Sequence, residues 1–377
     1  METPFIYGRL ARQENFTDRE QETAKLLQNF NSLTNTIIIS PRRWGKSSLV
    51  ENAARQALSE NSNLRICVVD LFNVKTEAEF YTALAGSIIK GTSSRWEEMA
   101  ENTRRFFTKL IPRFSFSADP QNSFSLDFDY DTVLKNPDEI LDLAEAVALD
   151  KNLRIIVCID EFQNIANFTE PVAFQRKLRS HFQRHTKVGY CLYGSKRHML
   201  LDVFTNPNMP FYNFGDIMFL EKIDTQHWLS FITSRFDATG KKIDSATAGY
   251  IVELMKNHPY YVQQLSQLSW LRTTDVCSQD IVEAAHKSLV EQFGLVFSTL
   301  AETLTGQQMN VLRAIVNGEK NLTSAAVLKK YHISSSSVVI RCKEALIEKD
   351  IIDSKVGEVT LIDPVFSWWL KNSYFAD

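Results

Sequence analysis

The chain has 377 residues, 44% of them apolar, which predicts two or three domains with packed cores. Its 42 basic and 45 acidic residues nearly cancel, so a general electrostatic attraction to nucleic acid is not expected. No apolar run reaches 18 residues, no charged-then-apolar leader opens the sequence, and the five cysteines lack metal-ligand spacing. We therefore expect a cytoplasmic protein in a reducing compartment, without a membrane partner.

The first local signal is the segment Phe16 to Glu20. Thr17 and Asp18 are residue types that cap helices, and we expect one of them to begin the helix that follows. A second interpretation is that the segment contacts the base of a nucleotide. The residues alone leave both interpretations open.

The next stretch organises the whole chain. Ile37 to Ile39 reads as a buried strand, and an apolar face recurs at helical spacing from Ser48 to Leu58. Between them lies the loop Ser40, Pro41, Arg42, Arg43, Trp44, Gly45, Lys46, Ser47, followed by Ser48 at the helix start. A strand, a loop ending in Gly-Lys-Ser and a helix form the context of a phosphate-binding loop.

This loop predicts a nucleotide site. Backbone N–H groups and the helix dipole favour an anion at the helix start. Lys46 would neutralise the β- and γ-phosphates, and the Ser47 hydroxyl would coordinate Mg²⁺. Ser40 stands where the usual pattern has its first Gly, a change that strains the backbone only if this position needs a positive φ.

Further apolar runs follow as strand candidates: 64–71, 153–160, 188–193 and 217–220. Helical patterns fill the intervals, for example 78–90 and 138–149. Continuous apolar strands are typical of a parallel sheet covered on both faces. The alternation therefore predicts a doubly wound α/β domain.

An insertion interrupts this alternation at about 113–129. Arg113 to Ser117 and Phe124 to Phe128 alternate apolar and polar residues around the turn-forming cluster Asp119 to Asn122. We interpret it as a β-hairpin with an aromatic stripe. The stripe either packs on the parent domain, which we favour, or binds a partner.

A second chemical signal ends the strand at 153–160, where an apolar run leads into Asp160 and Glu161. Behind a phosphate-binding loop, Asp160 would bind Mg²⁺ and Glu161 would act as general base on the attacking water. Alone, such a strand end could simply face solvent.

The strand at 188–193 leads into Ser195, Lys196 and Arg197. If this strand lies between those of Lys46 and Asp160, the Ser195 hydroxyl sits beside the γ-phosphate, where it can sense the phosphate or orient water. The helix at 173–185 has an apolar face and a face with Arg176, Arg179, Arg184 and His185. A solvated basic face is favoured over an arginine that acts across an oligomer interface.

The remaining chain predicts two smaller domains. Residues 224–303 are helical throughout, and Pro259 is expected to end the helix that carries Met255. Residues 304–377 give three helices and a two-stranded ribbon across Gly357, a winged-helix pattern. The predicted domains are a core at 1–223, a helical domain at 224–303 and a winged helix at 304–377.

Together these features resemble the archaeal-type P-loop ATPases, a branch of the AAA+ and STAND superfamily that also occurs in bacteria. The matching motifs span nearly the whole chain: Phe16 to Glu20, Pro41 to Ser47, Ile159 to Gln163, Gly194-Ser195, Asn257 to Tyr261 and Asp363 to Leu370. The resemblance implies an ASCE-type ATPase core, a helical lid and a C-terminal winged helix. It also implies that Phe16 and Arg19 lie near the adenine and that Pro259 of the lid closes over the nucleotide, although Asn257 stands where the lid motif usually has Gly.

We therefore expect a Mg²⁺-dependent protein that binds ATP and ADP and hydrolyses ATP slowly as a conformational switch. One alternative is a DNA-binding regulator that works through the winged helix. From Thr303 onward, nine Lys/Arg against eight Asp/Glu give weak support for DNA, so a protein partner or self-association is favoured. Another alternative is a nucleotide-bound scaffold without turnover.

Overall fold

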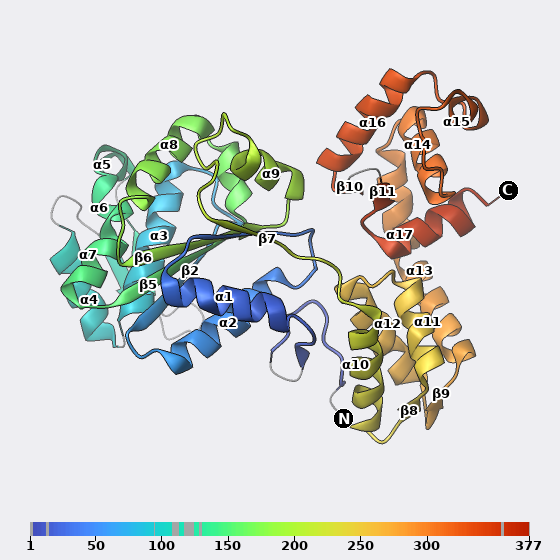
Figure 1. The fold of residues 1–377 in the computed structure, drawn as a ribbon, viewed down its shortest axis with the longest axis horizontal. Helices are drawn as coiled ribbons and strands as arrows, with labels where there is room; N and C mark the ends of the chain where they lie inside the picture. The colour runs from blue at the N-terminus through green and yellow to red at the C-terminus, as the bar shows by residue number, and fades with distance from the viewer. Residues whose placement is uncertain are drawn as a thin grey trace. The chain divides into compact units, whose positions relative to one another are not determined.

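The computed structural model describes residues 3–12, 15–93, 95–107, 113–116, 124–127, 130–355 and 358–376. The chain divides into two compact units (Figure 1). The core unit comprises Arg19–Arg42 and Lys46–Glu221. The helical unit comprises Met1–Asp18, Arg43–Gly45 and Lys222–Asp377. Each unit is described by itself.

The core unit is built on a five-stranded sheet with the order β2-β5-β6-β1-β7, in which every neighbouring pair is parallel. Its strands are β1 (Thr36–Ile39), β2 (Leu64–Asp70), β5 (Arg154–Asp160), β6 (Val188–Gly194) and β7 (Asp216–Phe219). All five predicted strands form. β6 lies between β1 and β5, which is the condition that the sequence prediction set for Ser195.

Helices cover both faces of this sheet, with α1 and α2 on one side and α8 and α9 on the other (Figure 1). The helical elements are α1 (Glu20–Ser32), α2 (Lys46–Glu60), α3 (Glu77–Thr92), α4 (Trp96–Phe106), α5 (Tyr130–Lys135), α6 (Asp138–Leu141), α7 (Leu143–Asp150), the 3-10 turn η2 (Phe162–Asn167), α8 (Pro171–Phe182) and α9 (Arg197–Thr205). Ile37 and Ile39 share one core with side chains of α3, α7, α8 and α9. Ile38 between them is equally buried, which explains why the strand is apolar at every position.

The helical pattern predicted at 138–149 forms as two helices, α6 and α7, which are separated at Asp142. Asp142 has φ −93° and ψ 0°, and its carboxylate Oδ1 lies 2.6 Å from His181 Nδ1 and 3.0 Å from His185 Nε2. The break coincides with the contacts of Asp142 to His181 on α8 and to His185, which follows α8. Helical periodicity carries no sign of such a partner.

The predicted hairpin has two antiparallel strands, β3 (Arg113–Phe116) and β4 (Phe124–Asp127), in which Phe114 lies opposite Leu126. The cluster Asp119 to Asn122 and the side chains of the aromatic stripe lie outside the described residues. The two interpretations of that stripe therefore remain predictions.

The helical unit contains α10 (Thr225–Asp237), α11 (Ser245–Leu254), α12 (Pro259–Arg272) and α13 (Gln279–Glu302). A short parallel pair, β8 (Lys242–Ile243) with β9 (Val276–Cys277), departs from the prediction of helix throughout. The prediction that Pro259 ends the helix carrying Met255 is wrong. α11 ends at Leu254, before the left-handed residues Lys256 and Asn257, and Pro259 begins α12 because its fixed φ suits a first helical position.

The C-terminal part of this unit is a winged helix. It contains α14 (Gly306–Val316), α15 (Ala325–Lys330) and α16 (Ser336–Glu348), then β10 (Ile352–Lys355) antiparallel to β11 (Glu358–Leu361). Thr305, Ser324 and Ser335 cap the three helices. α17 (Pro364–Trp369) and the π-helical turn η3 (Leu370–Tyr374) follow the wing.

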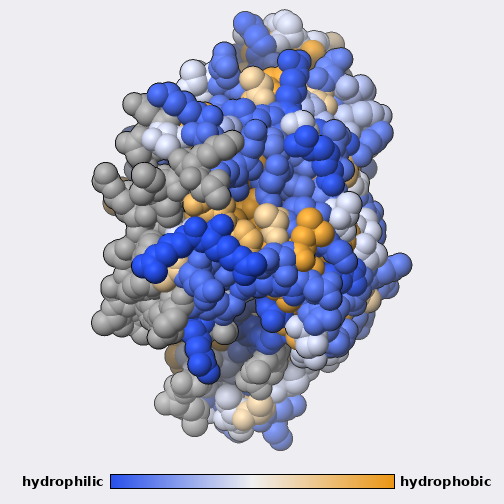
Figure 2. Space-filling model, turned by 90° about the vertical axis from the view of Figure 1, so that its left-hand side faces the viewer, coloured by the Kyte–Doolittle hydropathy of each residue, from blue (hydrophilic) through white to orange (hydrophobic). Residues whose placement is uncertain are grey.

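Across the described chain, no helix is both long and apolar enough to cross a membrane. The face of the core unit near α4 to α7 is mainly hydrophilic, with a small apolar area near the middle (Figure 2). All five cysteines are buried and unbridged, so Cys67, Cys158 and Cys191 are small core residues as predicted.

Candidate nucleotide-binding site

The loop after β1 has a left-handed backbone at Arg43, with φ 64°, and at Gly45, with φ 89°. Ser40 has no positive φ, so a side chain is tolerated there without backbone strain. Ser40 is fully buried and its Oγ donates to the Pro41 carbonyl oxygen at 3.2 Å. The glycine of the usual pattern is therefore not required by the backbone of this loop.

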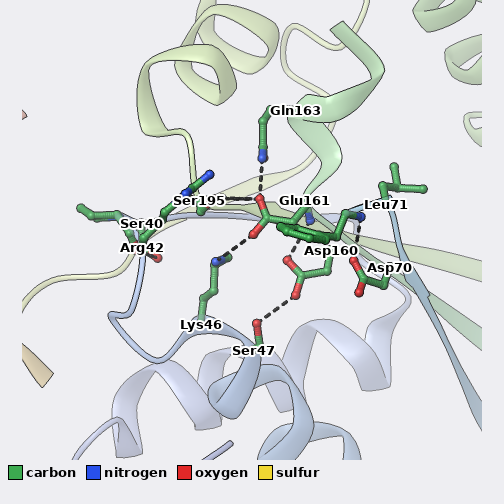
Figure 3. Close-up of polar contacts among 12 residues, drawn as sticks. Ser40, Arg42, Lys46, Ser47, Asp70, Leu71, Asp160, Glu161, Gln163 and Ser195 are labelled. Atoms are coloured by element: carbon green, nitrogen blue, oxygen red, sulfur yellow. Dashed lines mark hydrogen bonds and ion pairs between the residues drawn. The ribbon is translucent and has the colours of Figure 1, made fainter. Parts of the chain in front are cut away.

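Residues of the loop meet the end of β5 at the carboxyl edge of the sheet (Figure 3). Ser47 Oγ donates to Asp160 Oδ2 at 2.9 Å. Lys46 Nζ lies 3.6 Å from Glu161 Oε1. Parallel strands bring their carboxyl ends to one edge, which is where ligands of open α/β sheets bind.

Ser195 completes this cluster from the end of β6. Its Oγ donates to Glu161 Oε2 at 2.8 Å and its backbone N–H donates to the same oxygen at 3.3 Å. Arg42 Nε in turn donates to Ser195 Oγ at 3.2 Å. The structure thus brings together Lys46, Ser47, Asp160, Glu161, Ser195 and Arg42, all in the core unit.

The pKa values of the two carboxyl groups are shifted in opposite directions. Burial raises the pKa of Asp160, and the nearby Lys46 charge and the Ser47 hydrogen bond only partly oppose this. Burial acts to raise the pKa of Glu161 as well, but the Lys46 charge and hydrogen bonds from Gln163 and Ser195 outweigh it and lower that pKa. Divergent environments of neighbouring carboxyl groups are typical of functional sites.

The donor set suits a magnesium ion. A hydroxyl and a carboxylate lie within hydrogen-bond distance of each other at Ser47 and Asp160, and both are oxygen ligands of the kind that Mg²⁺ prefers. The site thus fits the cofactor that the sequence predicts. Ser48, the next residue of α2, is buried.

Several predicted binding residues group with the helical unit. The Arg43 guanidinium lies 4.5 Å from the Tyr260 ring centroid, and the Trp44 ring packs edge-on to His258 with centroids 6.4 Å apart. Pro259, which lies between His258 and Tyr260 in the sequence, is buried, and Phe16 is half-buried. Gly45 is part of the helical unit, as are Arg43 and Trp44. Burial, together with the charges of Lys222 and Arg43, lowers the pKa of His258 to about 3, so its ring is neutral at physiological pH.

Arg19 lies in the core unit and has a role that the sequence did not indicate. It is the N-cap residue of α1 with φ 78°, whereas Thr17 and Asp18 do not cap the helix. Its guanidinium is buried and donates to Glu22 at 2.9 Å and to the Glu221 carbonyl oxygen at 2.5 Å. This side chain therefore fixes the start of α1 to the segment that leaves β7.

The basic face predicted at 173–185 is solvated only in part: Arg176 and Arg184 are exposed, whereas Arg179 and His185 pack against other side chains. Arg179 lies 4.7 Å from the Phe214 ring centroid, and burial lowers its pKa. His185 has only 3% of its side chain exposed, and its Nδ1 lies 2.7 Å from the Tyr190 hydroxyl. The expectation that His185 lies on a solvated face is wrong, because its ring nitrogens contact Asp142 and Tyr190.

The sequence motif contains Gln163 without giving it a role, yet its Nε2 donates to Glu161 Oε2. Asp70 carries no sequence signal either, although it lies beside Asp160 in the sheet register. The available signal for Gln163 was its place two residues after Glu161. A polar residue that follows the acidic end of a strand in the sequence can hydrogen-bond to those acids when the chain forms a tight turn such as η2.

Comparisons with known proteins agree with this fold. A family model described as a probable winged helix domain matches residues 295–372. No curated protein matches the chain by sequence. Among solved structures, the Walker-type ATPase of Pyrococcus abyssi is similar at 19% identity, covering 97% of this chain and 99% of that one, with a TM-score of 0.66.

Two further structures from Aeropyrum pernix are similar at a TM-score of 0.50. The ORC1 protein in complex with DNA has 12% identity and covers 96% of this chain and 94% of that one. The ORC2 protein in its ADP form has 14% identity and covers 95% and 94%. At these identities the likeness shows the fold alone. The chain has the fold of the archaeal Walker-type ATPases, with a P-loop core and a C-terminal winged helix, as the sequence predicted.

Proposed function

We propose that this protein binds ATP with Mg²⁺ and hydrolyses it slowly, so that the bound nucleotide acts as a conformational switch. The observation that carries the proposal is the convergence of Lys46, Ser47, Asp160, Glu161 and Ser195 at one edge of the sheet. The division into a core at 1–223, a lid at 224–303 and a winged helix at 304–377 belongs to the same proposal.

Each side chain has a separate task in this mechanism. Lys46 and the N–H groups at the start of α2 bind the phosphates. Ser47 and Asp160 hold Mg²⁺, which when bound neutralises phosphate charge. Glu161 accepts a proton from the attacking water, and its low pKa keeps it ionised at neutral pH. Ser195, already bonded to Glu161, reports whether a γ-phosphate is present.

Three variants separate binding from chemistry. Lys46→Ala should weaken ATP and ADP binding together, because the ammonium group contacts phosphate directly. Glu161→Gln keeps the shape without the base, so it should bind Mg-ATP and lose turnover by roughly 10²-fold or more. Asp160→Asn should show a mixed loss.

Calorimetry gives the affinities of these variants and phosphate release gives their rates. Turnover by Glu161→Gln equal to that of the parent would show that Glu161 is not the base. A parent that binds ATP without hydrolysing it would favour the scaffold alternative instead.

A DNA-binding regulator remains the second candidate, because one structural relative was solved with DNA and the winged helix is a fold that can bind DNA. The exposed face of α16 argues against it. That face carries Arg341 and the half-buried Lys343, but also Ile340, Glu344 and Glu348. A protein partner or a second copy of the chain suits such a mixed surface better.

Duplex DNA at physiological salt provides the test. Binding should be looser than micromolar. A salt-sensitive, sub-micromolar affinity that Arg341→Ala removes would establish the DNA-binding alternative.

A further inference from the structure

The side chain of Gln163 lies against the predicted general base. It is 1% exposed, and its Nε2 donates to Glu161 Oε2 at 2.5 Å. Ser195 gives the same oxygen two more donors, its hydroxyl at 2.8 Å and its backbone N–H at 3.3 Å. One carboxylate oxygen of Glu161 thus receives three hydrogen bonds (Figure 3).

The other oxygen of Glu161 has a different environment. Oε1 lies 3.6 Å from Lys46 Nζ, on the side of the phosphate-binding loop. Oε2 has its lone pairs committed to three donors, so it is the poorer proton acceptor. The proton taken from water therefore goes to Oε1, which keeps free acceptor capacity.

The Gln163 amide is held in this orientation at a cost. Its own Oε1 is buried and has no hydrogen-bond partner among the described residues. A Cβ placed on Gly194 would lie 1.8 Å from that oxygen, so the amide occupies space that only glycine leaves free. Buried unpartnered carbonyl groups are uncommon, and here the carbonyl oxygen lies beside Gly194 while the amide nitrogen keeps its contact to Glu161.

We propose that Gln163 is a positioning residue that orients Glu161, so that Oε1 rather than Oε2 faces the attacking water. This role rests on the proposed function as an ATPase. Gln163 acts through Glu161 and contacts no substrate.

Gln163→Met tests the role, because methionine keeps the length of the side chain and removes the donor. The matched control is Gln175→Met on α8. Gln175 is equally buried, and its Oε1 likewise has no hydrogen-bond partner within the part of the chain that the structure describes. Both variants lose a buried amide, and only the first loses a donor to Glu161.

Steady-state phosphate release across pH gives the first readout. For Gln163→Met we expect kcat to fall roughly tenfold to a hundredfold, which is the effect of losing a hydrogen bond to a charged group. The KM for ATP should change by less than about threefold, because Gln163 does not bind the nucleotide. The acidic limb of the kcat profile should move to higher pH, because the carboxylate loses a donor. Gln175→Met should keep the kcat and the limb of the parent.

A second readout needs no turnover. In a double-mutant cycle with Glu161→Ala, the effect of Gln163→Met on the unfolding equilibrium constant should shrink by about tenfold or more when Glu161 is absent. Gly194→Ala should reproduce the kcat loss and the limb shift, because the added Cβ displaces the amide.

The outcomes separate the two proposals. If the parent hydrolyses ATP and Gln163→Met keeps its kcat and acidic limb, the positioning role is wrong and the ATPase proposal stands. If the parent binds ATP without releasing phosphate, the proposed function fails, and the positioning role fails with it even where the cycle shows coupling. Loss of kcat with a shifted limb, absent in Gln175→Met, supports both.

Discussion

Asp363 ties the winged helix to α12, and its removal gives a sharp test of the structure. Its Oδ1 accepts hydrogen bonds from the backbone N–H groups of Val365 and Phe366, both at 2.9 Å, and so caps α17. Its Oδ2 accepts a hydrogen bond from the buried Tyr261 hydroxyl at the start of α12. All of these residues belong to the helical unit.

The expected cost of Asp363→Ala has two parts. Loss of an N-cap destabilises a helix by about 0.5–2 kcal/mol. Leaving the buried Tyr261 hydroxyl without its partner adds about 1–3 kcal/mol. The variant should therefore lower the free energy of unfolding by roughly 2–4 kcal/mol, the middle of the two ranges combined.

Urea unfolding followed by tryptophan fluorescence measures this cost, because Trp228, Trp270, Trp368 and Trp369 all lie in the helical unit. Two matched variants divide it. Asp244→Ala removes a cap from α11, whose acceptor takes the Thr247 N–H, and should cost about 1 kcal/mol. Tyr261→Phe removes only the hydroxyl and should cost about 1–2 kcal/mol.

The reasoning is refuted if Asp363→Ala costs no more than Asp244→Ala. Additive effects of Asp363→Ala and Tyr261→Phe would likewise show that the two side chains do not interact. The expected double variant is less destabilised than the sum of the single ones, because one hydrogen bond is lost in both.

Three further predictions follow from backbone angles and pKa directions. Ser40→Gly should leave ATP affinity within about twofold by calorimetry, because Ser40 has no positive φ; it should lower the free energy of unfolding by at least about 0.4–1 kcal/mol, because glycine loosens the unfolded chain and the buried Oγ contact to Pro41 is lost. Burial acts to raise the pKa of Asp142, but the contacts with His181 and His185 outweigh it and lower that pKa in the folded protein. The contribution of Asp142 to the free energy of unfolding is therefore present above pH 3.8 and is lost as the pH falls through this lowered pKa. Asp142→Asn should therefore be less stable than the parent at neutral pH, and a gap that persists unchanged in strong acid would contradict this. Burial raises the pKa of Asp363, so its contribution has the opposite sign: the parent should gain stability relative to Asp363→Asn as the pH falls toward 3.8, measured as the difference in urea midpoints.

The sequence predicted the sheet well because its strands are buried on both faces. Each strand is a continuous apolar run, and the loop after β1 carries a recognisable motif. The order of strands was predicted only as a condition, since periodicity says nothing about neighbours. Once β6 is known to lie between β1 and β5, the contact of Ser195 with Glu161 follows from the parallel register.

The failures have a common physical cause, which is tertiary contact that overrides local pattern. The helix at 138–149 has unbroken apolar periodicity, yet Asp142 leaves it to bind two histidines far along the chain. Thr17 and Asp18 are better capping residues than Arg19, yet Arg19 takes the position because its buried guanidinium reaches the Glu221 carbonyl oxygen. No window of neighbouring residues contains either partner.

Backbone strain adds a signal that sequence reading does not reach. Eleven residues other than glycine have positive φ in the described chain, a conformation that is unfavourable for them. Six of the eleven lie within or beside a motif that the resemblance assigns to nucleotide binding: Asp18, Arg19, Arg43, Glu161, Lys256 and Asn257. Glu161 is the most informative, because φ 52° turns the chain back so that Gln163 and Ser195 reach the same carboxylate oxygen. A strained residue persists only when its surroundings determine it, and here those surroundings are the groups that would set the direction and the pKa of the base.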